Sequence, residues 1–331
     1  MQLQARPRRP PPHPPAELPA PAAATSAASL MARIKRARSP EALQQLLDGS
    51  AARLDHLHAS ALLVRLAHVA VLQQRQQTPR LNAASQQLLD RLAALFSSHL
   101  GRYQARQLAS CMWALGKLKL SCTPAASALA AAAAQRLLQG GLLAAHPGGA
   151  QALDVSHTAW GLARLQRSQQ PPLADPGEAA AAWQLVGAAA QQHLPAMNAQ
   201  QLSNTLWAFG QARAAHPQLM EGAAARICSR SRPLRLRAQH VANLAWAFAR
   251  LGRHAAADAA LWQALQRWVV DQAPHMKAQG ISVTLWAFAR AGASAPAATE
   301  ALVAAARPQL KRFRPQALSG TLWSLHTQVG G

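Results

Sequence analysis

The sequence has 331 residues, of which 50% are apolar and only 14% are charged. Its 34 Lys and Arg residues outnumber its 12 Asp and Glu residues, which gives a formal net charge of +22. This charge favours polyanionic partners such as nucleic acid, with an anionic membrane surface as the rival. No apolar run approaches the roughly 20 residues of a membrane-spanning helix, so we expect no membrane span.

The chain also lacks the sequence patterns of catalytic and metal sites. It contains no phosphate-binding glycine loop, no GxSxG or HExxH motif and no zinc-type spacing of Cys and His. The three cysteines, Cys111, Cys122 and Cys228, are scattered, which is typical of buried thiols in a reducing compartment. We therefore predict a protein that is not an enzyme, with no catalytic residues, cofactor, metal or small-molecule substrate.

Residues 1–38 are predicted to be a disordered leader rich in Pro, Ala and Arg. Pro10–Pro12 and Pro14–Pro15 exclude a helix there. Arg6, Arg8 and Arg9 and several hydroxyl residues, with almost no acid, are typical of an organelle transit peptide. A chloroplast address fits better than a mitochondrial one, because no amphipathic arginine helix is evident. The alternative is a Pro-rich leader without a targeting role.

The ordered part of the chain is predicted to begin at residue 39. Ser39 can cap a helix and Pro40 suits its first position, while Leu43, Leu46 and Leu47 have helical spacing.

From residue 39 to 331 the sequence repeats one motif, written most clearly as QLSNTLWAFGQA at residues 201–212. With Trp207 taken as position 0, successive copies lie 37 to 49 residues apart. Near-constant spacing of this size predicts an array of two-helix units. We therefore predict an all-α solenoid of about seven repeats, wound as a right-handed superhelix, with the last repeat incomplete. Position 0 is occupied by Val64, Trp113, Trp160, Trp207, Trp246, Trp286 and Trp323.

Each repeat is predicted to contain a motif helix and a second, Ala/Leu-rich helix. In the motif helix, positions −5, −1 and +2 are apolar and form one narrow stripe, as Leu202, Leu206 and Phe209 illustrate. A further apolar residue at −10 is expected to fix the entry into the helix from the loop. Pro often opens the second helix, as at Pro124 and Pro296.

Positions −7, −3 and +4 lie beside the tryptophan, at about 20°, 60° and 40° on the helical wheel. Position −7 is often Gln, −3 is variable and often polar, and +4 is mostly a cation. Stacked repeats would align these side chains as a stripe that holds phosphates and reaches base edges. The alternative is that each cation simply extends into solvent. The predicted RNA-binding residues are Ser110, Lys117, His157, Arg164, Gln200, Asn204, Gln211, Gln239, Asn243, Arg250, Gln279 and Arg290.

The tryptophan itself is predicted to pack between neighbouring motif helices rather than to stack on a base. Two basic clusters lie outside the motif. One is in the loop before residue 238, and the other is at residues 311–314. They are either phosphate contacts or solvated surface.

The motif copies TLWAF at residues 205–209 and 284–288 and LAWAF at 244–248 resemble the octotricopeptide-repeat proteins of algal organelles. They are also similar to the heptatricopeptide units of RAP-domain and FAST-kinase-like proteins. The resemblance covers about residues 40–331. It implies an α-solenoid that binds organelle transcripts, with roughly one repeat per nucleotide, and supports their stability, processing or translation. No RAP domain and no PPPEW-like segment are found in the sequence.

These observations predict a single-stranded RNA-binding protein of the chloroplast, with the mitochondrion as the alternative location. Other organelle gene-expression proteins are possible partners. The alternative function is an armadillo-like scaffold whose groove binds an acidic protein partner, because positive charge fits either role.

Overall fold

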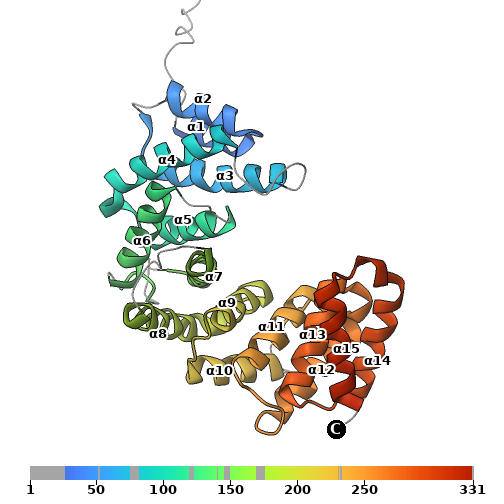
Figure 1. Ribbon diagram of the computed structural model, residues 1–331. Coiled ribbons are helices and arrows are strands. Elements are labelled where there is room, and N and C mark those ends of the chain that lie inside the picture. Colours follow the sequence, from blue (N-terminus) through green and yellow to red (C-terminus); the bar gives the residue numbers. More distant parts are fainter. Residues whose placement is uncertain are drawn as a thin grey trace, which may run out of the picture.

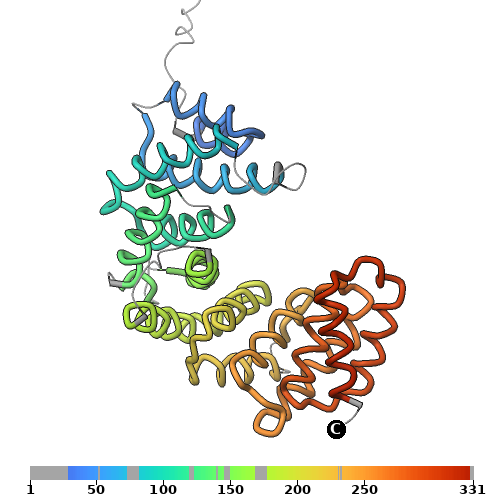
Figure 2. The backbone as a smooth tube through the Cα atoms, in the orientation of Figure 1, coloured from blue at the N-terminus to red at the C-terminus, as the bar shows by residue number. Residues whose placement is uncertain are grey.

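In the computed structural model, the protein is an array of helices. The structure describes residues 27–50, 53–74, 82–118, 123–139, 141–144, 150–168, 176–229, 231 and 233–329. These residues form fifteen α-helices. Figures 1 and 2 show the helices following one another in a curved series from α1 to α15. The prediction of an all-α solenoid is confirmed.

All seven copies of the tryptophan motif form a helix, and each of these motif helices packs on the next one along the chain. The motif helices therefore form one continuous layer of the solenoid. They are α3 (His56–Gln74), α5 (Ala105–Lys117), α7 (Ala152–Ser168), α9 (Ala199–Ala212), α11 (Ala238–Arg250), α13 (Ala278–Ala291) and α15 (Pro315–Val329).

The helices between them form a parallel second layer, in which each helix also packs on the next. These second helices are α4 (Ala83–Ser98), α6 (Pro124–Gln139), α8 (Pro176–His193), α10 (Pro217–Cys228), α12 (Ala259–Gln272) and α14 (Pro296–Ala306). The last of these ends at Ala306. A 3₁₀ segment covers Arg307–Arg312, because Pro308 has no N–H with which to continue the α-helical ladder.

The predicted boundary of the leader at residue 38 is wrong for residues 27–36. They form helix α1 (Ala27–Arg36), in which Leu30 and Ile34 are buried. α1 packs on α3, and α2 (Pro40–Gly49) packs on α4, so this pair continues both layers ahead of the first repeat. Helix α2 was expected from Ser39 and Pro40, whereas α1 contains no copy of the motif and was not predicted. Residues 1–26, which carry most of the predicted transit peptide, lie outside the described residues.

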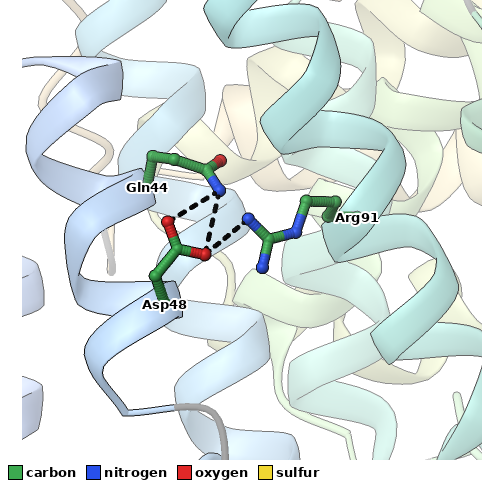
Figure 3. A network of polar contacts seen from close by, with 3 residues as sticks. All are labelled: Gln44, Asp48 and Arg91. Carbon is green, nitrogen blue, oxygen red and sulfur yellow. Dashed lines mark hydrogen bonds and ion pairs between the residues drawn. The ribbon is translucent and has the colours of Figure 1, made fainter.

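Helix α2 begins as its sequence predicts. The Ser39 hydroxyl oxygen accepts a hydrogen bond from the backbone N–H of Ala42 at 3.2 Å, and Pro40 occupies the first helical position. Figure 3 shows Asp48 of α2 reaching Arg91 of α4, with 2.7 Å between Oδ1 and Nη1. Gln44 also donates to the Asp48 carboxylate. Both members of the ion pair are exposed, so it orients α2 more than it stabilises the fold.

The apolar stripe of the motif helices forms the core between the two layers. Leu202, Leu206 and Phe209 are fully buried, and their counterparts in the first six repeats are buried. In the seventh repeat Leu318 and Leu325 are only partly buried, and Leu322 is 68% exposed. The apolar residue at position −10 precedes the helix in extended backbone and is buried, as at Met197 and Met276. Both predictions are confirmed in most repeats, and burial of these residues against the second layer provides the main driving force for folding.

Small residues allow the motif helices to approach one another closely. A Cβ atom on Gly116 of α5 would lie 3.1 Å from the Cα of Gly161 in α7. Serines at position −4 link neighbouring repeats, because Ser156 donates to the carbonyl of Gln201 and Ser282 donates to the carbonyl of Ala317. These bonds join one motif helix to the backbone of the next and fix their register.

Candidate nucleic-acid interface

The tryptophans of successive repeats follow one another along one side of the motif-helix layer. The ring centroids of Trp160 and Trp207 are 6.3 Å apart, and those of Trp207 and Trp246 are 6.4 Å apart. The predicted contact between neighbouring motif helices is therefore present. These rings are only partly buried, however, so they also form part of the surface. We call the side of the motif helices that carries positions −7, −3, 0 and +4 the motif face.

Cations at position +4 lie over the tryptophans in the second and third repeats. The ammonium of Lys117 is 5.6 Å from the ring centroid of Trp113 and 5.7 Å from that of Trp160. The guanidinium of Arg164 is 5.6 Å from the Trp160 ring. Burial lowers the pKa of Arg164, and the charge of Arg167 lowers it further. Two positive charges are thus held over tryptophan rings in the second and third repeats of the motif face.

The residues at position −3 contribute different groups in successive repeats. His157 stacks on Trp113 with 5.5 Å between ring centroids, while the smaller Ser110 is half-buried in α5. Burial lowers the pKa of the His157 imidazole below its ordinary value. The charge of Arg106 also lowers this pKa, whereas the charge of Asp154 raises it. The ring is therefore neutral at pH 7.

In the fourth repeat the predicted amides contact each other. Gln200 donates through Nε2 to Oδ1 of Asn204 at 2.8 Å. His240 of the next motif helix lies 3.1 Å from the other Gln200 amide atom, Oε1. The sequence analysis did not select His240. It stands at position −6, where Gln107, Asp154 and Gln201 use their side chains to accept the backbone N–H at the start of their own helices.

A hollow of about 480 Å³ opens on the motif face across α9, α11 and α13. It brings together predicted residues from three successive repeats, at positions +4, −7 and −3. The rings of Trp207 and Trp246 border it, and its lining contains no acidic side chain. The predicted residues that line it are Gln211, Gln239, Asn243 and Gln279.

Two other hollow-lining residues were not predicted. Lys277 precedes α13 and His275 lies in the 3₁₀ segment before it. Both follow the second helix of the fifth repeat, so the helical wheel of the motif could not place them. Their position means that loops as well as motif helices contribute to this surface.

The remaining predicted residues are on the motif helices but outside the hollow. Arg250 and Arg290 are exposed at the C-terminal ends of α11 and α13. Gln211 does line the hollow; it stands where most other repeats have a cation, is half-buried, and its Oε1 lies 3.5 Å from Nη1 of Arg167. The motif face therefore has a cation-rich part around Lys117 and Arg164 and an amide-rich part from α9 to α13.

The basic loop before α11 adjoins a second hollow, of about 490 Å³, between α10 and α12. This hollow is lined by Trp268 and Arg267 but also by Asp271, so it is less uniformly suited to an anion. Burial raises the pKa of Cys228 at its edge, which disfavours the reactive thiolate. Arg230 and Arg232 of the loop lie outside the described residues.

No group of three or more His, Cys, Asp or Glu side chains is placed to hold a metal ion in the part of the chain that the structure describes. None of the helices described is both long enough and apolar enough to cross a membrane.

No protein-family model matches the chain, and no curated protein matches it. The class that the structure defines is therefore a helical-repeat protein, an α-solenoid of two-helix units.

Proposed function

We propose that the motif face binds single-stranded RNA. The observation that carries this proposal is the hollow across α9, α11 and α13, in which amides from three repeats lie beside two tryptophan rings. Amide side chains offer both donors and acceptors to base edges. Aromatic rings offer stacking surfaces that accept any base, and stacking is worth about 1–3 kcal/mol per base. Unpaired bases of a single strand can reach both kinds of group.

The charge of the chain supports a polyanionic partner. The net charge is +22, and no Asp or Glu lines the hollow. Lys117, Arg164, Arg250 and Arg290 occupy the same position in their repeats, where they would follow a phosphate backbone along the array. Under this proposal the +4 cations hold the strand, and the −3 and −7 side chains distinguish its bases.

The hollow limits how much of the strand one site can hold. Its volume of about 480 Å³ is in the range of small-molecule pockets, so it would accommodate one or two nucleotides. The rest of the strand would lie along the neighbouring repeats. A longer RNA should therefore bind more tightly than a dinucleotide, in steps that follow the number of repeats covered.

The biological setting is part of the proposal. The resemblance to octotricopeptide-repeat proteins supports a role in the stability, processing or translation of organelle transcripts, without catalysis. Residues 1–26 would direct the chain to the chloroplast, with the mitochondrion as the alternative. A fusion of residues 1–38 to a fluorescent protein tests the location, and diffuse fluorescence throughout the cell would contradict it.

Titration of the full chain with fluorescent 20-nucleotide RNAs tests the proposal directly. We expect binding that weakens steeply as salt rises, because counterions are released from the strand. Changing Arg250 and Arg290 to Gln should weaken binding to all sequences, whereas changing Asn204 or Asn243 to Ala should alter base preference. Wild-type affinity and preference in both variants would overturn the proposal. A protein partner that survives nuclease treatment in pull-downs would favour the scaffold function instead.

A further inference from the structure

A directed series of hydrogen bonds crosses the boundary between the fourth and fifth repeats. The backbone N–H of Arg237 donates to Nδ1 of His240 at 3.2 Å. Because Nδ1 accepts this bond, the proton of the neutral ring is on Nε2. Nε2 therefore donates to Oε1 of Gln200, at 3.1 Å. Gln200 in turn donates through Nε2 to Oδ1 of Asn204, at 2.8 Å.

The first of these bonds determines the orientation of every group after it. Rotation of the Gln200 amide by 180° would place its N–H₂ group against the His240 N–H and its oxygen against the Asn204 oxygen. Both bonds would be lost, so one orientation is strongly favoured. Asn204 consequently turns its oxygen toward Gln200, and its Nδ2 group is left to donate to a partner on the motif face.

His240 is well placed to hold this arrangement. Its side chain is buried, with 8% of its surface exposed, and the start of α11 fixes it through the Arg237 bond. Burial lowers the pKa of the His240 imidazole, and the charge of Arg237 lowers it further. The ring is therefore neutral at pH 7, which is the form that the two bonds require.

The fifth repeat has the same amides without this constraint. Gln239 and Asn243 occupy positions −7 and −3, but no side-chain hydrogen bond involves either of them among the described residues. The residue that would correspond to His240 in the next repeat is Gly280, which has no side chain. Asn243 can therefore turn either its oxygen or its nitrogen toward a ligand.

We propose that His240 is a specificity-determining residue that acts through Gln200 to present Asn204 as a hydrogen-bond donor. The fourth repeat would then select a base with a keto oxygen, guanine or uracil, over a base with an amino group at the same place, adenine or cytosine. An amino group facing the Asn204 N–H₂ group would leave both donors unpaired, so we expect a preference on the order of 10-fold. This inference rests on the proposed binding of RNA.

The test uses a substitution that removes only the donor. In His240→Asn, the amide oxygen takes the place of Nδ1 and can still accept the Arg237 N–H, but no atom replaces Nε2. Gln107→Asn is the matched control. Gln107 accepts the N–H of Gln104 at the start of α5 in the same way, and the residue at position −7 of the preceding repeat is Leu57, which has no amide.

Each full-length protein is incubated with a pool of random 20-nucleotide RNAs, and the bound RNAs are sequenced. The position that loses its preference in Asn204→Ala identifies the base facing the fourth repeat. Wild type and Gln107→Asn should favour guanine or uracil there by about 10-fold. His240→Asn should reduce this preference to about twofold or less, with preferences elsewhere unchanged. If His240→Asn is unfolded by circular dichroism, Gln200→Met, which cannot relay the bond, should give the same loss.

Three results separate the possible failures. Unchanged keto preference in the His240 and Gln200 variants would overturn the inference, because Asn204 would then need no orientation. A wild-type preference for adenine or cytosine at the fourth repeat would also overturn it. Failure of the wild type to enrich any RNA would instead contradict the proposed function on which the inference rests.

Discussion

Gly161 of α7 lies directly against the backbone of Met112 in α5. A Cβ atom on Gly161 would be 2.5 Å from the carbonyl oxygen of Met112, a distance that side chains in proteins do not tolerate. The absence of a side chain at Gly161 therefore sets how closely the second and third motif helices approach. The same contact holds Trp113 and Trp160 near enough for Lys117 to lie over both rings.

Replacing Gly161 by Ala should destabilise the protein. The added methyl group meets backbone rather than a flexible side chain, so the two helices must separate, at a cost of about 1–3 kcal/mol. Gly49→Ala is the control, because a Cβ atom there would meet nothing within 4 Å. Urea unfolding followed by circular dichroism measures the difference, and equal midpoints for the two variants would show that the close approach is not required.

Replacing Trp246 by Leu should weaken RNA binding more than it affects folding. The ring borders the amide-lined hollow and is partly exposed, so a stacked base would lose about 1–3 kcal/mol. Trp268→Leu is the control, because Trp268 is also half-buried but belongs to α12 in the second layer, where it lines the second hollow. Fluorescence titration gives both affinities. A larger loss in the Trp268 variant would place the binding surface on the second layer.

The salt dependence of RNA binding should reflect phosphate contacts made by the cations at position +4. Changing Arg250 and Arg290 to Gln should reduce the slope of log K against log salt by about 1.4, since each phosphate contact on a single strand contributes about 0.7. Arg267 and Arg307 are also exposed but lie on or beside second helices, so their replacement should leave the slope nearly unchanged. Titrations from 50 to 300 mM salt measure the slopes, and equal decreases would indicate a diffuse electrostatic effect.

Stability should fall as the pH drops, partly through His157. Burial lowers the pKa of its imidazole in the folded protein, so between that value and the ordinary value of about 6.5 the unfolded chain binds the extra proton. The buried neutral ring of His157 contributes fully to the stability of the fold above about pH 6.5. This contribution is lost as the pH falls from there toward the lowered pKa. Thermal unfolding from pH 8 to 5 should show a smaller decline in Tm for His157→Asn than for wild type. The same change at exposed His275 should preserve the wild-type decline, and a steep decline in the His157 variant would contradict the argument.

The motif pattern predicted the architecture because its apolar positions coincide with the residues that are buried. The apolar positions of Leu202, Leu206 and Phe209 recur at the same spacing and are buried in the first six repeats, so one helical wheel was enough to define most of the core. The same wheel placed Gln239 and Asn243 on one face, and the structure brings them to one hollow.

Residues that act between repeats could not be predicted in this way. On its own helix His240 makes the same capping bond as Gln107 and Gln201, and its further role follows only from the distance to Gln200 on a neighbouring helix. The tryptophans were predicted to pack between neighbouring motif helices, and the rings of Trp160, Trp207 and Trp246 do so while remaining only partly buried. Helix α1 was missed because Leu30 and Ile34 pack on the array without carrying its motif.

The bond from His240 to Gln200 has a consequence for attempts to redesign the array. A repeat protein whose units act separately can be rebuilt by exchanging single units. Here a graft that replaces the fifth unit alone would also alter the chemical character of the fourth, because His240 would be removed together with the replaced unit. Exchanges should therefore transfer residues 199–250 as one block, with the cuts placed on either side of the α9–α11 pair.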